Sequence, residues 1–240
     1  MKDCLKDLVE HTFDLGCIDL IKIVGDTETT EISALAEDLS VVVQGKFHNP
    51  VADFAGTFGM PNLGKLKTLL NLQEYRENAK LSITRKATQE LDGINFENAA
   101  GDFKNNYRFM ASGVVNEKLK TAKFRGANWH IEFEPTNAAI QRLKWQMAAN
   151  AEEPNFQAKT ENGNLKFFFG DHSTHAGNFV FQSGVIGQLK RTWSWPAKQF
   201  ASIMDLTGDK IVRISDDGAA QITVDSGMAL YNYILPAQSK

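Results

Sequence analysis

The chain has 240 residues, 23% of them charged, a formal net charge of −3 and two cysteines. This length suits one large domain or two domains of about 100–120 residues. Two cysteines make no disulfide framework and suit a reducing, cytosolic setting. The sequence contains no run of about 18 apolar residues, so no membrane span is predicted. The N-terminal MKDCLKDLVEHTFD is too charged for a secretory signal. Nucleic-acid-binding domains are usually basic, whereas this chain is slightly acidic. Contact with DNA would therefore require basic residues segregated onto one surface.

The first half of the chain predicts two helices, each followed by three strands. The first helix runs from Met1 to about Leu15, and strands follow in DLIKIV, TEISALAED and LSVVVQGKF. Residues 48–60 contain one proline and two glycines and are predicted to be a connection. The second helix spans Asn62–Leu72, with Asn62 as its N-cap. Strands are then predicted in AKLSITR, GINFEN and NNYRFMA.

The second half repeats this order after a polar segment. SGVVNEKLKTAKFRGAN, Ser112 to Asn128, is basic and non-periodic, which predicts an interdomain connector. A strand in NWHIEFE leads to a helix that begins at Thr136 or Asn137 and ends near Asn150. The remaining predicted elements are strands at Asn155–Lys159 and in NLKFFFGD, GNFVFQSG and GQLKRTWSW, a helix at Pro196–Leu206, the hairpin KIVRISDDGAAQITVD and the strand MALYNYILP.

The predicted helices begin near residues 1, 62, 136 and 196, which indicates duplicated units. We therefore expect an N-terminal domain at residues 1–112, a connector at 113–127 and a C-terminal domain at 128–240. Short strands of this kind form mostly antiparallel sheets, each with one face that helices must cover. The predicted fold class is α+β, with two similar domains of antiparallel sheets and two helices on one side of each.

The outward faces of these helices carry basic residues in three of the four cases. At about 100° per residue, the outer positions are Lys65 and Thr68 in the second helix, Gln141, Arg142 and Trp145 in the third, and Lys198 and Ser202 in the fourth. Lys67 and Lys144 lie on the flanks of the second and third helices. The first helix differs, because Asp3, Asp7, Glu10 and Asp14 are predicted opposite its apolar stripe, with Lys2 and Lys6 on the flank. Taken singly, each lysine is expected to be a solvated surface residue. The recurrence of basic residues on the outer sides of three helices favours a shared function.

Two helix-to-hairpin passages carry a family resemblance, NLGKLKTLLNL…AKLSITR and WPAKQFASIMDL…KIVRISDDGAAQITVD, the latter continuing into MALYNYILPAQ. Over nearly its whole length the chain resembles the DNA polymerase sliding clamps, most closely those of tailed bacteriophages, in the proliferating-cell-nuclear-antigen-like clamp family. Clamps of this type close with a Leu-Ala-Pro-like tripeptide. Here the order differs and reads Leu235-Pro236-Ala237.

The resemblance implies a non-enzymatic processivity factor that acts without a cofactor or metal in the cytoplasm of a bacterial host. Such clamps are head-to-tail homotrimeric rings whose helices line a bore for duplex DNA, bound without sequence preference through phosphates. Their partners are a DNA polymerase and a clamp loader. The DNA-facing residues implied here are Lys65, Lys67, Arg142, Lys144 and Lys198, with Lys2 and Lys6 on the first helix.

The family also binds short apolar peptides of replication proteins in one pocket per subunit. The matching positions are Leu235, Pro236 and Ala237, with Val114 and Val115 of the connector as the expected rim. Ring subunits would join by edge-strand pairing, for which FVFQSG or NYRFMA is a candidate.

Two other patterns suggest alternatives. Trp193 and Trp195 resemble a stacking platform, so the second hypothesis is a β-rich phage structural or carbohydrate-binding module. Asp171, His172 and His175 could ligate a metal or serve a hydrolase, but lie between two strands without a further ligand cluster, so a solvated turn is favoured. Neither GxGxxG nor GxxxxGK[ST] occurs, so no nucleotide site is predicted.

Overall fold

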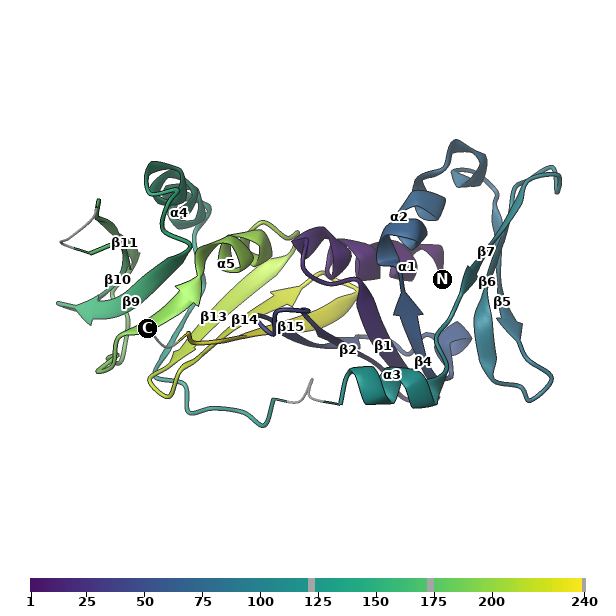
Figure 1. Ribbon diagram of the computed structural model, residues 1–240, viewed down its shortest axis with the longest axis horizontal. Helices are drawn as coiled ribbons and strands as arrows, with labels where there is room; N and C mark the ends of the chain where they lie inside the picture. The colour runs from purple at the N-terminus through teal and green to yellow at the C-terminus, as the bar shows by residue number, and fades with distance from the viewer. Residues whose placement is uncertain (121–123, 172–174, 239–240) are drawn as a thin grey trace. The chain divides into compact units, whose positions relative to one another are not determined.

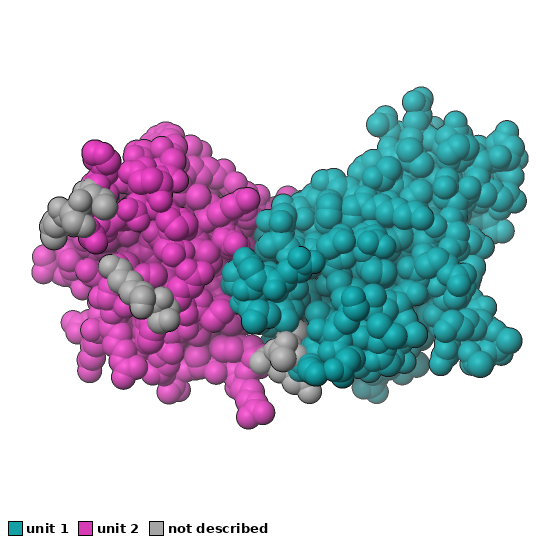
Figure 2. All heavy atoms as spheres, in the orientation of Figure 1, with its two compact units in different colours: residues 1–123, 226–231 teal, residues 124–225, 232–240 magenta. Residues whose placement is uncertain are grey.

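The computed structural model describes residues 1–120, 124–171 and 175–238, and the chain divides into two compact units (Figure 2). Unit 1 comprises residues 1–123 and 226–231, and unit 2 comprises residues 124–225 and 232–240. Each unit combines antiparallel sheets with a pair of contacting helices (Figure 1). The α+β fold class predicted from the sequence is confirmed.

The main sheet of unit 1 has the strand order β4-β1-β2-β3, and every neighbouring pair is antiparallel. Its strands are β1 (Leu20–Gly25), β2 (Thr30–Leu35), β3 (Val42–Phe47) and β4 (Gly56–Pro61). Ile23 pairs with Ile32 on one side and Phe58 on the other, and all three are buried. A second sheet contains β5 (Lys80–Arg85), β6 (Leu91–Glu97) and β7 (Lys104–Arg108), with β5 and β7 at its edges.

Two short helices, α1 (Lys2–Glu10) and α2 (Leu63–Asn71), pack against each other in unit 1. The chain leaves α1 through the 3₁₀ turn η1 (Phe13–Leu15), which ends at Gly16 with φ of 78°. A Cβ atom at Gly64 would lie 3.0 Å from the ring of Phe13, so this glycine lets η1 approach α2 closely. Two further 3₁₀ turns, η2 (Ala52–Phe54) and η3 (Gln73–Tyr75), complete the helical segments before β5.

A buried polar cluster fixes α1 to the last strand, β15 (Ala229–Pro236), whose first three residues belong to unit 1. The Tyr231 hydroxyl donates to Oδ2 of Asp7 at 2.7 Å, and the His11 ring stacks on Tyr231 with centroids 4.8 Å apart. His11 Nδ1 also lies 3.3 Å from the Asp7 carboxylate. All three side chains are buried. Since a buried carboxylate is costly unless it is hydrogen-bonded, Asp7 and Tyr231 stabilise this contact only as a pair.

One sheet of unit 2 has the strand order β11-β10-β9-β12. The other strands of this unit are neighbours in the order β15-β14-β13-β8. The bounds are β8 (Ile131–Phe133), β9 (Asn155–Glu161), β10 (Asn164–Phe169), β11 (Gly177–Ser183), β12 (Trp193–Pro196), β13 (Asp209–Ser215) and β14 (Ala219–Asp225). Asn162 and Gly163 have φ of 51° and 73° in the β9–β10 turn, the pair of positive angles that a tight hairpin requires.

The helices of unit 2 are α4 (Asn137–Ala149) and α5 (Ala197–Met204), which contact each other. The Thr136 hydroxyl accepts a hydrogen bond from the amide of Ala139 at 3.1 Å, so Thr136, one of the two residues predicted at the start of this helix, is its N-cap. Leu143 is fully buried, whereas Ile140 and Met147, which follow the same helical spacing, are only half-buried. The aromatic core beneath these helices includes Phe156, Phe167 and Phe200, whose rings lie 4.2–5.6 Å apart.

Two segments predicted to be irregular are ordered. The predicted connection at residues 48–60 contains η2 and most of β4, and the predicted connector at 112–128 begins with helix α3 (Ser112–Lys118). Val115 and Leu119 are buried against Leu20, Leu35, Val42 and Met110, which is why this polar segment becomes helical. Figure 1 shows α3 on the side of the β4-β1-β2-β3 sheet opposite α1 and α2.

The remaining differences concern element ends. The first helix ends at Glu10 instead of near Leu15, and the strand predicted over residues 187–195 is formed only from Trp193. Asn62 stands at the N-cap of α2 as predicted, but with φ of 55° and no hydrogen bond from its side chain to the helix.

Helix α3 packs against β4 where Gly59 leaves room for Val115. A Cβ atom at Gly59 of β4 would lie 2.8 Å from Cγ2 of Val115, so G59A should push α3 off the sheet and lower the free energy of unfolding by about 1–3 kcal/mol. G113A is the matched control in α3 itself, because a Cβ there meets nothing within 4 Å and alanine favours a helix by about 0.5–1 kcal/mol. Urea unfolding measures both. Equal stability of the two variants would contradict the packing described.

Candidate nucleic-acid interface

Three of the four helices in the two pairs, α2, α4 and α5, contain no aspartate or glutamate, although the chain has 29 acidic residues. Their charged residues are all basic: Lys65, Lys67, Arg142, Lys144 and Lys198. Helices in water ordinarily mix both charges on their exposed faces. The charge of these faces is therefore segregated, as an anion-binding surface on an acidic protein requires.

Lys65 and Lys198 are the most available of these cations. Both side chains are exposed, and neither forms an ion pair or hydrogen bond within the described parts of the chain. Each lies on a helix whose opposite face is buried: Leu63 and Leu66 in α2, and Phe200 and Ile203 in α5. Packing of the apolar stripe therefore directs both amines to solvent.

Lys67 and Lys144 are instead paired with carboxylates. Lys67 Nζ lies 2.7 Å from Oδ1 of Asp14, in η1, and Lys144 Nζ lies 2.5 Å from Oδ1 of Asp205, the C-cap of α5. All four side chains are between 33% and 48% exposed. Since exposed pairs of this kind contribute little stability, both lysines can exchange their partner for a phosphate at small cost. Sequence reasoning missed these counter-charges, because the paired residues are far apart in the chain.

Arg142 is exposed and held against the edge strand β11. Its Nη1 donates to the carbonyl oxygen of Val180 at 3.2 Å, and its guanidinium lies 5.4 Å from the centroid of the Phe179 ring. These contacts restrict the side chain without neutralising its charge. Lys210, which sequence reasoning did not select, is unavailable: its amine donates to the carbonyls of Leu206 and Gly208 after α5, and burial lowers its pKa.

The first helix carries little of the predicted basic face. Lys2 donates to the carbonyls of Tyr75 and Arg76, so its amine caps η3, whereas Lys6 is exposed. The prediction that Asp7 lies opposite the apolar stripe is wrong, because Asp7 is buried against Tyr231. Asp3 and Glu10 remain exposed on α1.

The residues predicted for a partner-peptide pocket differ in accessibility. Val115 and Leu235 are fully buried, while Val114 is 50% exposed and Pro236 is also exposed. Ala237 is half-buried. Next to α3, unit 1 instead has a hollow of about 450 Å³, lined mainly by Leu20, Leu35, Leu39, Met110 and Leu119, with Asp19, Glu37 and Lys118 among its polar residues. The connector thus borders a hollow of mixed polar and apolar lining through Lys118 and Leu119, and Val114 and Val115 are not among the lining residues.

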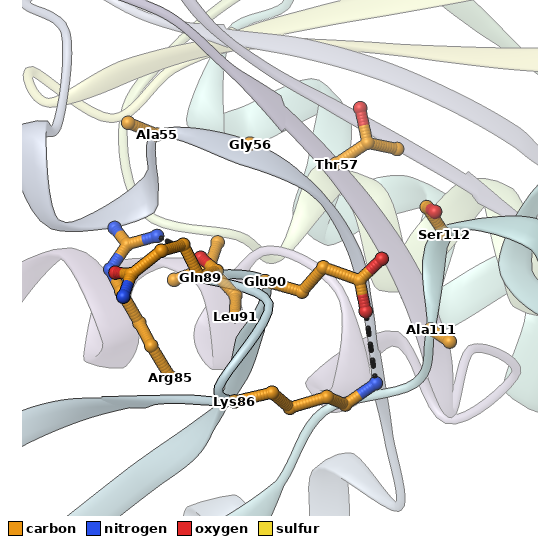
Figure 3. Close-up of a pocket in the computed structure, with 10 residues that line it drawn as sticks. All are labelled: Ala55, Gly56, Thr57, Arg85, Lys86, Gln89, Glu90, Leu91, Ala111 and Ser112. Atoms are coloured by element: carbon orange, nitrogen blue, oxygen red, sulfur yellow. Dashed lines mark hydrogen bonds and ion pairs between the residues drawn. The ribbon is translucent and has the colours of Figure 1, made fainter.

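A smaller hollow of about 200 Å³ lies at the β5–β6 turn (Figure 3). Its charged groups satisfy one another: Lys86 pairs with Glu90 at 3.2 Å, and Arg85 donates to the carbonyl of Gln89 at 3.0 Å. The volume is below the roughly 300 Å³ of typical small-molecule sites. Nothing in this arrangement pairs a nucleophile with a base.

The tryptophan platform suggested by the sequence loses its geometric basis. Trp195 is 1% exposed, and Trp193 Nε1 donates to the carbonyl of Asp216, so the two rings do not form an open platform. Of the histidine loop, residues 172–174 lie outside the described residues. Across the described chain, no group of three or more His, Cys, Asp and Glu side chains could hold a metal ion, and no described helix is long and apolar enough to cross a membrane.

The arrangement of antiparallel sheets and helix pairs is that of the DNA clamps. The chain is similar to PCNA from Thermococcus kodakaraensis, with a TM-score of 0.68, 10% identity, and coverage of 98% of this chain and 97% of that one. It is also similar to A. fulgidus PCNA in a structure with the C-terminal region of FEN-1 bound, with a TM-score of 0.71, 8% identity, and coverage of 100% and 97%. No protein-family model and no curated protein sequence matches the chain. At these identities the likeness establishes the PCNA clamp fold.

Proposed function

We propose that the chain is a non-enzymatic sliding clamp that encircles duplex DNA and tethers a replicative DNA polymerase. The observation that carries this proposal is the absence of carboxylates from α2, α4 and α5, in a chain of net charge −3 that adopts the clamp fold. Phosphate contacts are independent of sequence, so a few mobile cations suit a protein that must slide.

The proposed DNA-facing residues fall into three groups. Lys65, Arg142 and Lys198 contact phosphates directly. Lys67 and Lys144 do so after leaving their carboxylate partners. Lys6 contacts phosphate from α1. Lys2, whose amine is held by two backbone carbonyls, attracts the DNA by its positive charge without touching it. Because encirclement is topological, each contact can be weak.

We further propose a homotrimeric ring of chains with domains at residues 1–112 and 128–240, joined by a connector at 113–127. Edge strands β7 and β11 overlap the candidate sequences NYRFMA and FVFQSG, and each has no strand paired on its outer side within the described sheets, so each can pair with a neighbouring subunit. Such pairing would remove two exposed edges per chain.

The proposed partners are a DNA polymerase and a clamp loader of a tailed bacteriophage, acting in the cytoplasm of the bacterial host. Val114, Pro236 and Ala237, which are exposed or half-buried, are proposed as contacts for apolar peptides of these proteins, and Val115 and Leu235, next to them in sequence, are buried. The hollow beside α3, which includes Leu20, Leu35 and Leu119 in its lining, offers such a peptide further area to cover.

Charge reversal tests the DNA surface. We expect K65E/R142E/K198E to reduce processive synthesis on primed circular DNA at least about ten-fold, since several phosphate contacts are replaced by repulsion. The matched control is K80E/R125E/K190E, which makes the same charge change at exposed positions outside the helices. Unchanged stimulation by the helix variant, with its oligomeric mass intact, would contradict the assignment.

Releasing the paired lysines should act in the opposite direction. D14N/D205N frees Lys67 and Lys144, so we expect tighter binding to duplex and a salt dependence steeper by about 0.9 per added phosphate contact. Duplex binding measured from low to moderate salt gives this slope. E161Q is the control, because it breaks the comparable exposed pair with Lys166 on a sheet. A slope equal to that of E161Q would show that the freed amines do not meet phosphate.

Ring assembly is tested by solution mass. Light scattering should give three times the 26.7 kDa of one chain at micromolar concentration. Failure of the cognate polymerase to respond to the protein, with its loader present, would count against the clamp function whatever the mass. A dimeric mass would contradict the homotrimer specifically.

A further inference from the structure

Helix α4 carries one large apolar side chain that the fold does not use. Trp145 is 63% exposed, whereas Trp195 is 1% exposed in the core. In residues 1–120, 124–171 and 175–238, the indole of Trp145 makes no hydrogen bond and no ring contact. An indole presents a broad flat apolar face together with an N–H donor, and both are left in solvent here.

The neighbours of Trp145 on α4 leave that face open, and one of them, Arg142, is a cation. Gln141 and Arg142 lie one turn before it, and Ala148 and Ala149 lie one turn after it, all of them exposed. The two alanines are too short to cover the ring. Arg142 is held in place by Val180 and Phe179, and α4 contains no carboxylate. The matching ligand is flat, aromatic and joined to an anion, which describes a nucleotide with an exposed base.

We propose that Trp145 stacks on an unpaired DNA base while Arg142 contacts an adjacent phosphate, which gives the DNA surface a preference for duplex with a single-stranded extension over continuous duplex. This inference rests on the proposed DNA-binding function. Bases inside a duplex are already stacked on one another and offer an aromatic side chain only their edges. Base–aromatic stacking is largely independent of sequence, so it is compatible with a protein that slides.

The experiment uses the full chain and three DNA probes: a blunt duplex, the same duplex with a single-stranded extension, and the single strand alone. Binding is measured by anisotropy of labelled DNA, and quenching of tryptophan emission is followed in parallel. We expect W145A to bind the extended duplex roughly five- to a hundred-fold more weakly, the range of one base–aromatic stack. W145F should retain part of the difference. W129F, which alters a half-buried tryptophan outside α4, should bind all three probes as the unaltered chain does.

Binding of the blunt duplex separates this inference from the proposed function. If the unaltered chain binds blunt duplex but W145A loses nothing on the extended probe, stacking is wrong and the clamp proposal stands. If the unaltered chain binds none of the probes at low salt, the DNA-binding function fails. If dilution of the protein without DNA shifts the emission of the unaltered chain but not of W145F, a second copy of the chain covers Trp145, and the stacking proposal is overturned.

Discussion

The burial of one apolar stripe on each short helix is the constraint on which the structure depends. Helices of eight to thirteen residues are marginal in water by themselves, so α1, α2, α4 and α5 exist because one face of each is packed. Packing requires apolar residues on the inward face, such as Leu66 in α2 and Phe200 in α5. It does not constrain the outward residues, which can therefore serve binding. The exclusion of carboxylates from three outward faces therefore has no explanation in folding and points to a ligand.

The exception, α1, has a structural reason that its sequence pattern hides. Asp7 occupies a position that a helical wheel assigns to solvent, yet Tyr231 and His11 enclose it. The cluster anchors the start of β15, the strand that passes from unit 1 into unit 2. An acidic residue in α1 is thus partly a requirement of the fold, and the segregation of charge is correspondingly weaker on this helix.

Sequence reasoning succeeded where a pattern is local and failed where a contact is distant. The segment predicted as a helix over Asn62–Leu72 contains α2, and the start predicted at Thr136 or Asn137 matches that of α4. Helix α3 was missed because it buries only Val115 and Leu119, and β4 because its glycines resemble a loop. Gly59 links the two missed elements. It is one of the glycines that make β4 resemble a loop, and its missing side chain makes room for Val115 of α3. The pairs of Lys67 with Asp14 and Lys144 with Asp205 join residues far apart in sequence, so no spacing rule could reveal them.

The exposed indole of Trp145 and the paired lysines are both consistent with the proposed sliding function. A dense row of free lysines would hold one position on DNA strongly and slow movement, because every released phosphate contact costs free energy. Lysines that alternate between a nearby carboxylate and a phosphate lose less on each step, since one partner replaces the other. A flat aromatic face adds attraction only where bases are unpaired. If both proposals hold, the surface binds continuous duplex with nearly the same affinity at every position and binds more tightly where duplex meets single strand.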